Sequence, residues 1–155
     1  MKITLYPARV LRKMLWRKNR QVNPVQITKN GGVFAVESED GRFLYFAKFD
    51  APGIWKMPLG GGQEERVLPR AGSHEWFNWA LTRTGIYFRD SDKSKNHDVV
   101  GVLNFFDFAT GKTTTVTATD QPGGVGLAVA HDGRSILYDD KGDAESTIML
   151  VKNFR

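Results

Sequence analysis

The sequence contains no cysteine, only three histidines and no long uninterrupted apolar stretch. Without cysteine, neither a disulfide bond nor a thiolate metal site can form. No apolar run approaches the roughly 20 residues that a membrane-spanning helix needs. The N-terminus also lacks the apolar core of about 7–15 residues that a secretory signal requires. We therefore expect a cytoplasmic protein, although many exported bacterial proteins also lack cysteine, which leaves the periplasm as the alternative.

Residues with catalytic or metal-binding spacing are also scarce. His74, His97 and His131 have no partner at the spacing of a metal site, and no Gly-x-Ser-x-Gly motif is present. Residues 90–98 alternate oxygen side chains as a calcium loop does, but they lack its central glycine and its glutamate. The glycine run at 60–62 precedes a polar strand, so it is not a phosphate loop. The sequence predicts no catalytic residue, no metal site and no cofactor.

Positive charge is concentrated at the N-terminus. Residues 1–30 contain eight basic residues and no acidic one, and because the whole chain has a net charge of +5, the remainder carries 5 − 8 = −3. Such a segment can attract nucleic acid or an anionic membrane surface. The alternative is an ordinary solvated face. The eight residues are Lys2, Arg9, Arg12, Lys13, Arg17, Lys18, Arg20 and Lys29.

The sequence does contain a repeat with a period of roughly 45 residues, the length of one propeller blade. Residues 31–45 and 123–138 share Gly-Gly-Val, an alternating apolar strand, Asp-Gly-Arg and a second β-rich strand. A degenerate copy lies between them. The copies align on Gly41, Gly85 and Gly133, which we expect in tight turns because glycine adopts positive φ without a steric penalty.

Each copy predicts an antiparallel meander sheet. Third strands are expected at residues 53–57, 103–108 and 147–151, and polar fourth strands at 65–68 and 114–117. A fourth strand can be polar because it faces solvent. No amphipathic helical stretch interrupts the pattern, so the repeat favours a β-propeller over an irregular β-sandwich.

The repeat resembles that of TolB-type, WD-repeat-like bacterial propellers, whose turn reads Ser-Pro-Asp-Gly-Lys/Arg. Residues 38–42 read Ser-Glu-Asp-Gly-Arg and residues 130–134 read Ala-His-Asp-Gly-Arg, with Glu39 and His131 where proline is usual. The likeness covers residues 24–155. It implies the fold but says little about function, because propellers host many roles.

The predicted fold is all-β: a partial β-propeller of about three four-stranded antiparallel blades. A basic, degenerate or poorly ordered segment, residues 1–23, precedes the propeller region, residues 24–155. A six-bladed ring needs about 270 residues, so we expect a truncated member whose homodimer completes a ring. Residues 24–28 of one copy are a candidate fourth strand for the C-terminal blade of the other copy. The alternative is a monomer that uses its own N-terminal strand in this place. The blades are expected at about residues 31–72, 73–120 and 122–155.

We expect a non-enzymatic module that binds a protein or a ligand, derived from the sensory end of a bacterial regulator. The candidate partner contacts are His74, Glu75, Trp76 and Trp79, because tryptophan anchors many interfaces. The alternative is that both tryptophans fill space between blades. Two further hypotheses stay open: a basic segment that associates with nucleic acid or an anionic surface, and a propeller hydrolase.

Overall fold

A computed structural model describes residues 16–17, 25–71, 77–92, 100–119, 126–130, 132–141 and 146–152. The regular structure in these residues is entirely β-strand, and none of them belongs to a helix long and apolar enough to cross a membrane. The chain divides into two compact units, Met1–Trp76 and Phe77–Arg155. Each unit is described by itself.

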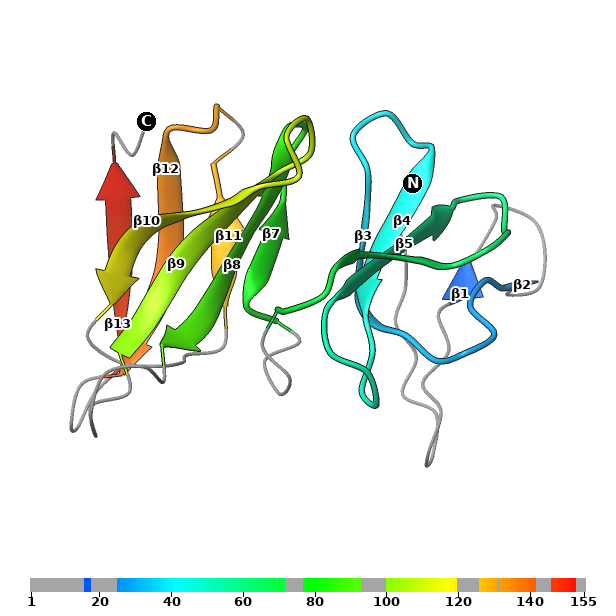
Figure 1. The fold of residues 1–155 in the computed structure, drawn as a ribbon, viewed down its shortest axis with the longest axis horizontal. Helices are drawn as coiled ribbons and strands as arrows, with labels where there is room; N and C mark the ends of the chain where they lie inside the picture. Colours follow the sequence, from blue (N-terminus) through cyan, green and yellow to red (C-terminus); the bar gives the residue numbers. More distant parts are fainter. Residues whose placement is uncertain are drawn as a thin grey trace. The chain divides into compact units, whose positions relative to one another are not determined.

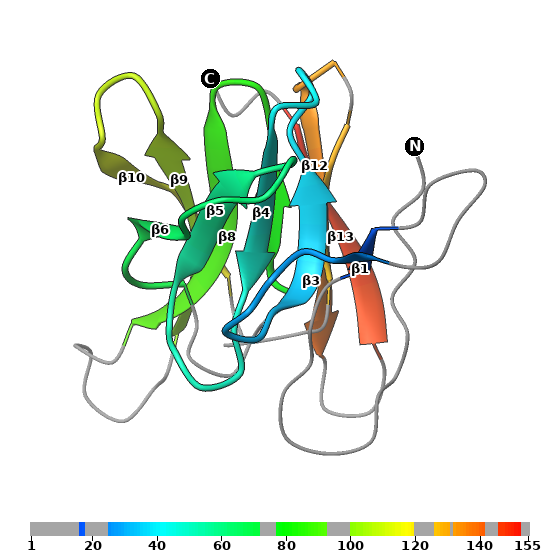
Figure 2. The same cartoon turned by 90° about the vertical axis from the view of Figure 1, so that its right-hand side faces the viewer.

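Unit 1 is built around one four-stranded antiparallel sheet with the order β3-β4-β5-β6, shown in Figure 2. Its strands are β3 (Val33–Glu37), β4 (Phe43–Ala47), β5 (Ile54–Pro58) and β6 (Glu65–Leu68). Alternation along these strands sends every second side chain to one face. There Leu44, Phe46, Met57 and Leu59 form a buried cluster, against which Ile27, Ala35 and Trp55 pack.

A second, two-stranded sheet in unit 1 consists of β1 (Trp16–Arg17) and β2 (Val25–Gln26). The expected strand at residues 24–28 is therefore present as β2, but β1 of the same chain already pairs with it. In the strand pairing, Trp16 of β1 lies opposite Gln26 of β2. In the larger sheet, Trp55 of β5 lies opposite Arg66 of β6. The basic segment 1–23 thus contributes one short strand, and its other residues lie outside those described.

Unit 2 contains two sheets that lie side by side (Figure 1). The first has the order β7-β8-β9-β10 and the second the order β11-β12-β13, and both are antiparallel meanders. Between them Tyr87, Leu103, Leu127, Ile136 and Tyr138 form a buried cluster. The strands are β7 (Trp79–Leu81), β8 (Gly85–Asp92), β9 (Val100–Asp107), β10 (Thr113–Thr119), β11 (Leu127–Val129), β12 (Ser135–Lys141) and β13 (Ser146–Lys152).

The predicted all-β fold of repeated meander sheets is confirmed. The sheets fall at residues 33–68, 79–119 and 127–152, and the last has three strands among the described residues. Of residues 90–98, which resemble a calcium loop only loosely, residues 90–92 belong to β8, because this strand runs on to Asp92. Residues 93–99 lie outside the described part of the chain.

Two of the three turn glycines have the expected backbone. Gly41 has φ 69° and Gly133 has φ 66°, and their amides donate to the carbonyl oxygens of Ser38 and Ala130. The prediction for Gly85 is wrong: its backbone is outside the left-handed region. The β7–β8 connection is two residues shorter, because Leu81 pairs with Ile86 whereas Glu37 pairs with Leu44.

Gly85 is the first residue of β8, where its lack of a side chain has a different use. A Cβ at this position would overlap the carbonyl oxygen of Phe106 and lie 2.6 Å from the ring of Phe105. The glycine therefore allows close strand contact rather than an unusual φ.

Candidate functional site

The predicted contact residues are placed only in part. His74, Glu75 and Trp76 lie outside the described residues. Trp79 begins β7, and its side chain is 1% exposed, so it is an interior side chain and presents no surface to a partner. Its neighbour Phe77 is a large apolar residue that is 42% exposed.

Asn78 connects the start of β7 to the next sheet of unit 2. Its side chain is 2% exposed, and its Oδ1 accepts a hydrogen bond from the Gly126 amide at 3.0 Å. Its main-chain oxygen accepts from the Arg89 amide at 2.9 Å. Gly126 directly precedes β11 as Asn78 directly precedes β7. The hydrogen bond between Asn78 and Gly126 therefore links β7 and β11, the first strands of the two sheets, next to the residues at which they begin.

Arg89, near the middle of β8, is the most deeply buried charged side chain described. It is 1% exposed, because the alternation of β8 turns it to the same face as Tyr87, the face that packs on the β11–β13 sheet. Arg89 Nη1 donates to the main-chain oxygen of Asp139 at 2.8 Å and lies 3.6 Å from its Oδ1. Arg89 Nη2 donates to Thr119 Oγ1 at 3.5 Å.

The Arg89 cluster, defined as Arg89, Thr119, Tyr138 and Asp139, therefore joins three strands from two sheets. The guanidinium carbon lies 5.0 Å from the centroid of the Tyr138 ring, within cation–π range. Arginine stays protonated at any physiological pH and has only donors. Here Nη1 and Nη2 donate to protein acceptors, so Arg89 holds the two sheets together and does not itself act as a general base.

Unit 1 contains a different buried ion pair. Lys48 follows β4 and Glu64 precedes β6, and their side chains are 8% and 10% exposed. Lys48 Nζ donates to Glu64 Oε2 at 2.6 Å and lies 4.0 Å from the ring centroid of Trp55. All three residues belong to one sheet and its connections. The pair therefore fixes the ends of strands within a single blade.

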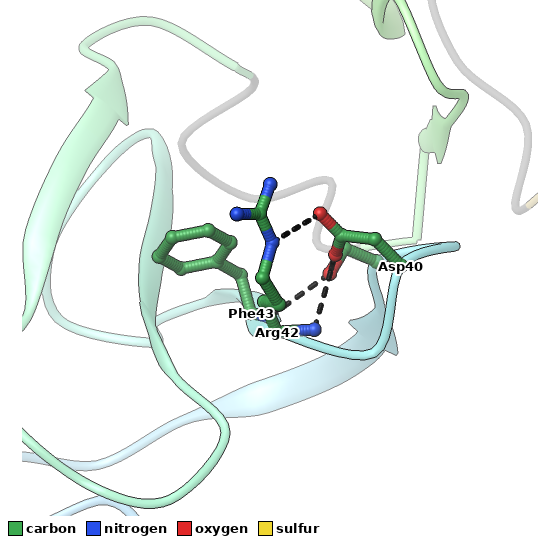
Figure 3. Close-up of polar contacts among 4 residues, drawn as sticks. Asp40, Arg42 and Phe43 are labelled. Carbon is green, nitrogen blue, oxygen red and sulfur yellow. Dashed lines mark hydrogen bonds and ion pairs between the residues drawn. The ribbon is translucent and has the colours of Figure 1, made fainter.

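The turn between β3 and β4 has a carboxylate at its centre (Figure 3). Asp40 Oδ1 accepts from Ser38 Oγ at 2.7 Å and from the Arg42 amide at 3.0 Å, and Asp40 Oδ2 accepts from Arg42 Nε at 2.6 Å. The Ser38 hydrogen bond, followed by those from Arg42, lowers the pKa of Asp40 from 3.8 to about 2. In the β11–β12 turn, Asp132 Oδ1 likewise accepts from the Arg134 amide at 2.9 Å. In both turns the aspartate stabilises the turn by accepting a hydrogen bond from the amide two residues later.

Sequence analysis did not identify Arg89, Lys48 or Glu64. In the sequence they look like ordinary surface charges, because nothing local marks them as buried. Among the residues that the structure describes, no three or more His, Cys, Asp or Glu side chains gather closely enough to hold a metal ion. Arg89, Lys48 and Glu64 take part in hydrogen bonds and ion pairs that join strands.

No protein-family model and no curated protein matches the sequence. Solved structures do match its shape. TolB from Acinetobacter baumannii matches with a TM-score of 0.66 and 15% identity, over 91% of this chain. The chain has the fold of part of a TolB-type β-propeller.

The matches cover only a part of each known protein. This chain spans 35% of the TolB chain, about a third of its length. The tricorn protease matches with a TM-score of 0.54 and 14% identity, over 82% of this chain and 13% of that protein. At these identities the likeness shows the fold alone. It confirms the partial propeller and the resemblance to TolB-type repeats.

Proposed function

We propose that this partial propeller is a non-enzymatic module that binds a protein or a small ligand at the end of unit 2 where β7 and β11 begin. The observation that carries the proposal is Phe77, a large apolar side chain 42% exposed at that end. Exposed aromatic side chains on a rigid frame are typical of interface anchors, because they bury much area at little entropic cost.

The frame beneath Phe77 is fixed by buried polar contacts. Asn78, the next residue, bonds through its main chain to Arg89 and through its side chain to Gly126. Arg89 in turn bonds to Asp139 on β12. Phe77 is therefore attached to a point where two sheets are held together. A partner that contacts Phe77 meets a surface that needs little reorganisation on binding.

The non-enzymatic part of the proposal is supported by the roles of the buried polar groups. Arg89 and Asn78 are engaged by the protein itself, and Arg89 cannot serve as a base or a nucleophile. The similarity to TolB supports a propeller fold and does not identify a ligand. The expected outcome is binding without turnover.

The test is selection of a random peptide library on phage against the whole chain. Wild-type protein is expected to enrich peptides that Phe77→Asp does not bind, because a charge at the centre of an apolar contact is costly to desolvate. Phe49→Asp is the matched control: Phe49 is also 42% exposed but lies in unit 1. Circular dichroism establishes that both variants are folded.

Three results would contradict the proposal. Peptides that bind Phe77→Asp as tightly as wild type would show that the location is wrong. Failure to enrich any peptide, together with no hit in a small-molecule thermal-shift screen, would show that this end is not a binding surface. Hydrolysis of an activated ester or a lactone above the buffer rate would favour a propeller hydrolase.

The second candidate function is association with nucleic acid or an anionic surface through the N-terminus. Eight basic and no acidic residues in residues 1–30 favour it. Binding driven by phosphate contacts weakens steeply as salt rises. Retention of the whole chain on heparin at low salt, with release at moderate salt, would support this function. Loss of retention on neutralising Arg9, Arg12 and Lys13 would assign it to the segment.

A further inference from the structure

Glycine follows an asparagine or an aspartate at three places in the sequence, namely Asn30-Gly31, Asp40-Gly41 and Asp132-Gly133. At such a pair the glycine amide nitrogen can attack the side-chain carbonyl carbon of the preceding residue, because glycine has no side chain in the way. The product is a cyclic succinimide. The attack needs an electrophilic side chain and a glycine amide that is not held in a hydrogen bond. The structure distinguishes the three pairs on both counts.

The two Asp-Gly pairs are held in hydrogen-bonded turns. The Gly41 amide donates to the main-chain oxygen of Ser38 at 2.9 Å, and the Gly133 amide donates to that of Ala130 at 2.8 Å. Both glycine nitrogens are therefore engaged. The carboxylate of Asp40 also accepts hydrogen bonds within its turn (Figure 3). The turns thus protect these two pairs from attack.

The charge of Asp40 adds to this protection, because only the neutral carboxyl group is a good electrophile. Hydrogen bonds from Ser38, and then from Arg42, lower the pKa of Asp40 from 3.8 to about 2. Each pKa unit changes the neutral fraction tenfold, so at neutral pH the neutral form is roughly 60-fold rarer in the folded chain. Folding therefore slows succinimide formation at Asp40.

Asn30-Gly31 lies in the link between β2 and β3 and has none of this protection. Asn30 is exposed, and neither residue belongs to a strand. Among the described residues, no turn or loop hydrogen bond engages the Gly31 amide or the Asn30 side chain. Asparagine is uncharged, so its side-chain carbonyl carbon stays electrophilic at every physiological pH. The conditions for attack are met at this pair.

The other asparagines of the described chain are in a different position. Asn78 is 2% exposed and precedes Trp79, and Asn104 is 8% exposed and precedes Phe105. A buried side chain with a bulky residue after it cannot close the ring easily. Among the described residues, Asn30 is thus the asparagine that is both exposed and followed by glycine.

We propose that Asn30 is a self-modification site, at which the folded chain reacts with water and converts this asparagine to aspartate and isoaspartate. The Gly31 nitrogen loses its proton and bonds to Asn30 Cγ, the Cγ–Nδ2 bond breaks, and ammonia leaves with that proton. Water then opens the succinimide at either carbonyl carbon, which gives aspartate or isoaspartate. Water is the co-reactant in both cases. This reaction is independent of the binding function proposed for Phe77.

The modification changes the link between β2 and β3 in two ways. Both products place a negative charge beside Lys29, and isoaspartate also lengthens the backbone by one carbon atom. The link is fixed on either side, because Thr28 is 0% exposed and Val33 is 6% exposed. The added atom therefore has to be accommodated between two packed residues. We expect isoaspartate to destabilise unit 1 more than aspartate does, and to accumulate as the chain ages.

The experiment is peptide mapping by mass spectrometry of the full chain, aged at neutral pH and body temperature, with an unaged sample as reference. Trypsin cleaves after Lys29 and Arg42, so residues 30–42 form one peptide that contains both Asn30-Gly31 and Asp40-Gly41. Asn30 is expected to convert while Asp40 stays unmodified in the same peptide. In urea, the rate at Asp40 is expected to rise by roughly 60-fold or more, whereas the rate at Asn30 stays close to its folded value.

Asn30→Gln is the matched control, because glutamine must close a larger ring and is expected to stay unmodified. Synthetic peptides separate isoaspartate from aspartate by chromatography. An Asn30 that stays intact in the folded chain but converts in urea would overturn the proposal, since the fold would then protect it. Conversion of Asn30→Gln equal to wild type, or isoaspartate at Asp40 as fast in the folded chain as in urea, would overturn it too.

Thermal unfolding tests the effect on the fold. Aged wild type is expected to melt below Asn30→Asp, because that variant carries the new charge without the longer backbone. A melting temperature equal to that of Asn30→Asp, in a sample that contains isoaspartate, would show that the link accommodates the added atom and would overturn the expected destabilisation.

Discussion

The two units bury a cation in different ways. In unit 1, Lys48 Nζ donates to Glu64 Oε2 at 2.6 Å, and the ring of Trp55 in the same sheet covers the Lys48 ammonium group. In unit 2, Arg89 donates to the main-chain oxygen of Asp139 on the neighbouring sheet, and to Thr119. Lys48 thus has one ionic partner within its own sheet. Arg89 has Asp139 and Tyr138 across the seam between two sheets, and Thr119 within its own sheet.

The difference follows from the chemistry of the two side chains. Lysine is a compact point charge, and one carboxylate with an aromatic face satisfies it. Arginine presents a planar fork of donors, which can bond to a main-chain oxygen and a side chain together. The arginine therefore suits the junction of two sheets, and the lysine suits the connections within one.

Arg89→Ala is expected to cause the largest loss of stability, about 3–5 kcal/mol in the free energy of unfolding. The substitution leaves a cavity at the seam and removes donors from buried acceptors. Urea denaturation followed by circular dichroism measures it. Arg134→Ala, at an exposed turn position, is the control, with an expected change within about 0.5 kcal/mol. A loss below about 1 kcal/mol in Arg89→Ala would show that the seam does not depend on arginine.

Lys48→Met is expected to cost about 3 kcal/mol, because the carboxylate of Glu64 is then buried without its partner. The double variant Lys48→Met with Glu64→Leu is expected to recover to within about 1 kcal/mol of wild type, since apolar side chains of similar size replace buried ion pairs well. No such rescue exists for Arg89, whose main acceptor is a backbone oxygen. If the double variant is as unstable as Lys48→Met alone, Glu64 is not the single ionic partner of Lys48.

Gly41→Val in unit 1 and Gly133→Val in unit 2 are each expected to cost about 1–3 kcal/mol, since both glycines have positive φ in equivalent turns. Equal losses would show that the turns are alike even though the buried cations differ. Gly60→Ala is the matched control, because a Cβ there meets nothing within 4 Å. If both valine variants keep the melting temperature of wild type, the assignment of Gly41 and Gly133 to positive-φ turns is wrong.

The smallest expected effect is a pH dependence in unit 1. Hydrogen bonds from Ser38, and then from Arg42, lower the pKa of Asp40 from 3.8 to about 2 in the folded protein. A lowered folded-state pKa means that the ionised form favours folding. The contribution is full above pH 3.8 and is lost as the pH falls from 3.8 towards 2.

An NMR titration of the Asp40 carboxyl group measures this pKa directly. Asp40→Asn is expected to reduce the fall in melting temperature over that pH range, with Asp132→Asn in the unit 2 turn as the comparison. An Asp40 pKa near 3.8 would show that the Ser38 and Arg42 contacts do not persist in solution.

Local patterns predicted the strands and two of the three turns. Alternation and the Asp-Gly-Arg sequence act within a few residues, so Gly41 and Gly133 were identified correctly. Gly85 was not, because the turn length depends on how Leu81 pairs with Ile86. Trp79 was a candidate contact, but it is 1% exposed, and burial depends on which sheet covers a strand face.

The buried cations needed the tertiary structure. Arg89 is separated from Thr119 by 30 residues and from Asp139 by 50, and Lys48 from Glu64 by 16. Nothing near any of these residues in the sequence distinguishes it from a solvated charge. Burial and pairing of this kind arise only when separate strands come together.

The sequence by itself determined the all-β repeat, its period and the conformation of its Asp-Gly turns, because these depend on side-chain alternation and on backbone sterics within a few residues. Only the tertiary structure decided which charges are buried and which apolar face remains exposed. Tyr87 pairs with Ala80 in one sheet and Leu137 pairs with Ala128 at the same register in the next, yet Tyr87 is 8% and Leu137 45% exposed. The physical reason is that exposure depends on the neighbouring sheet, which lies far away in the sequence.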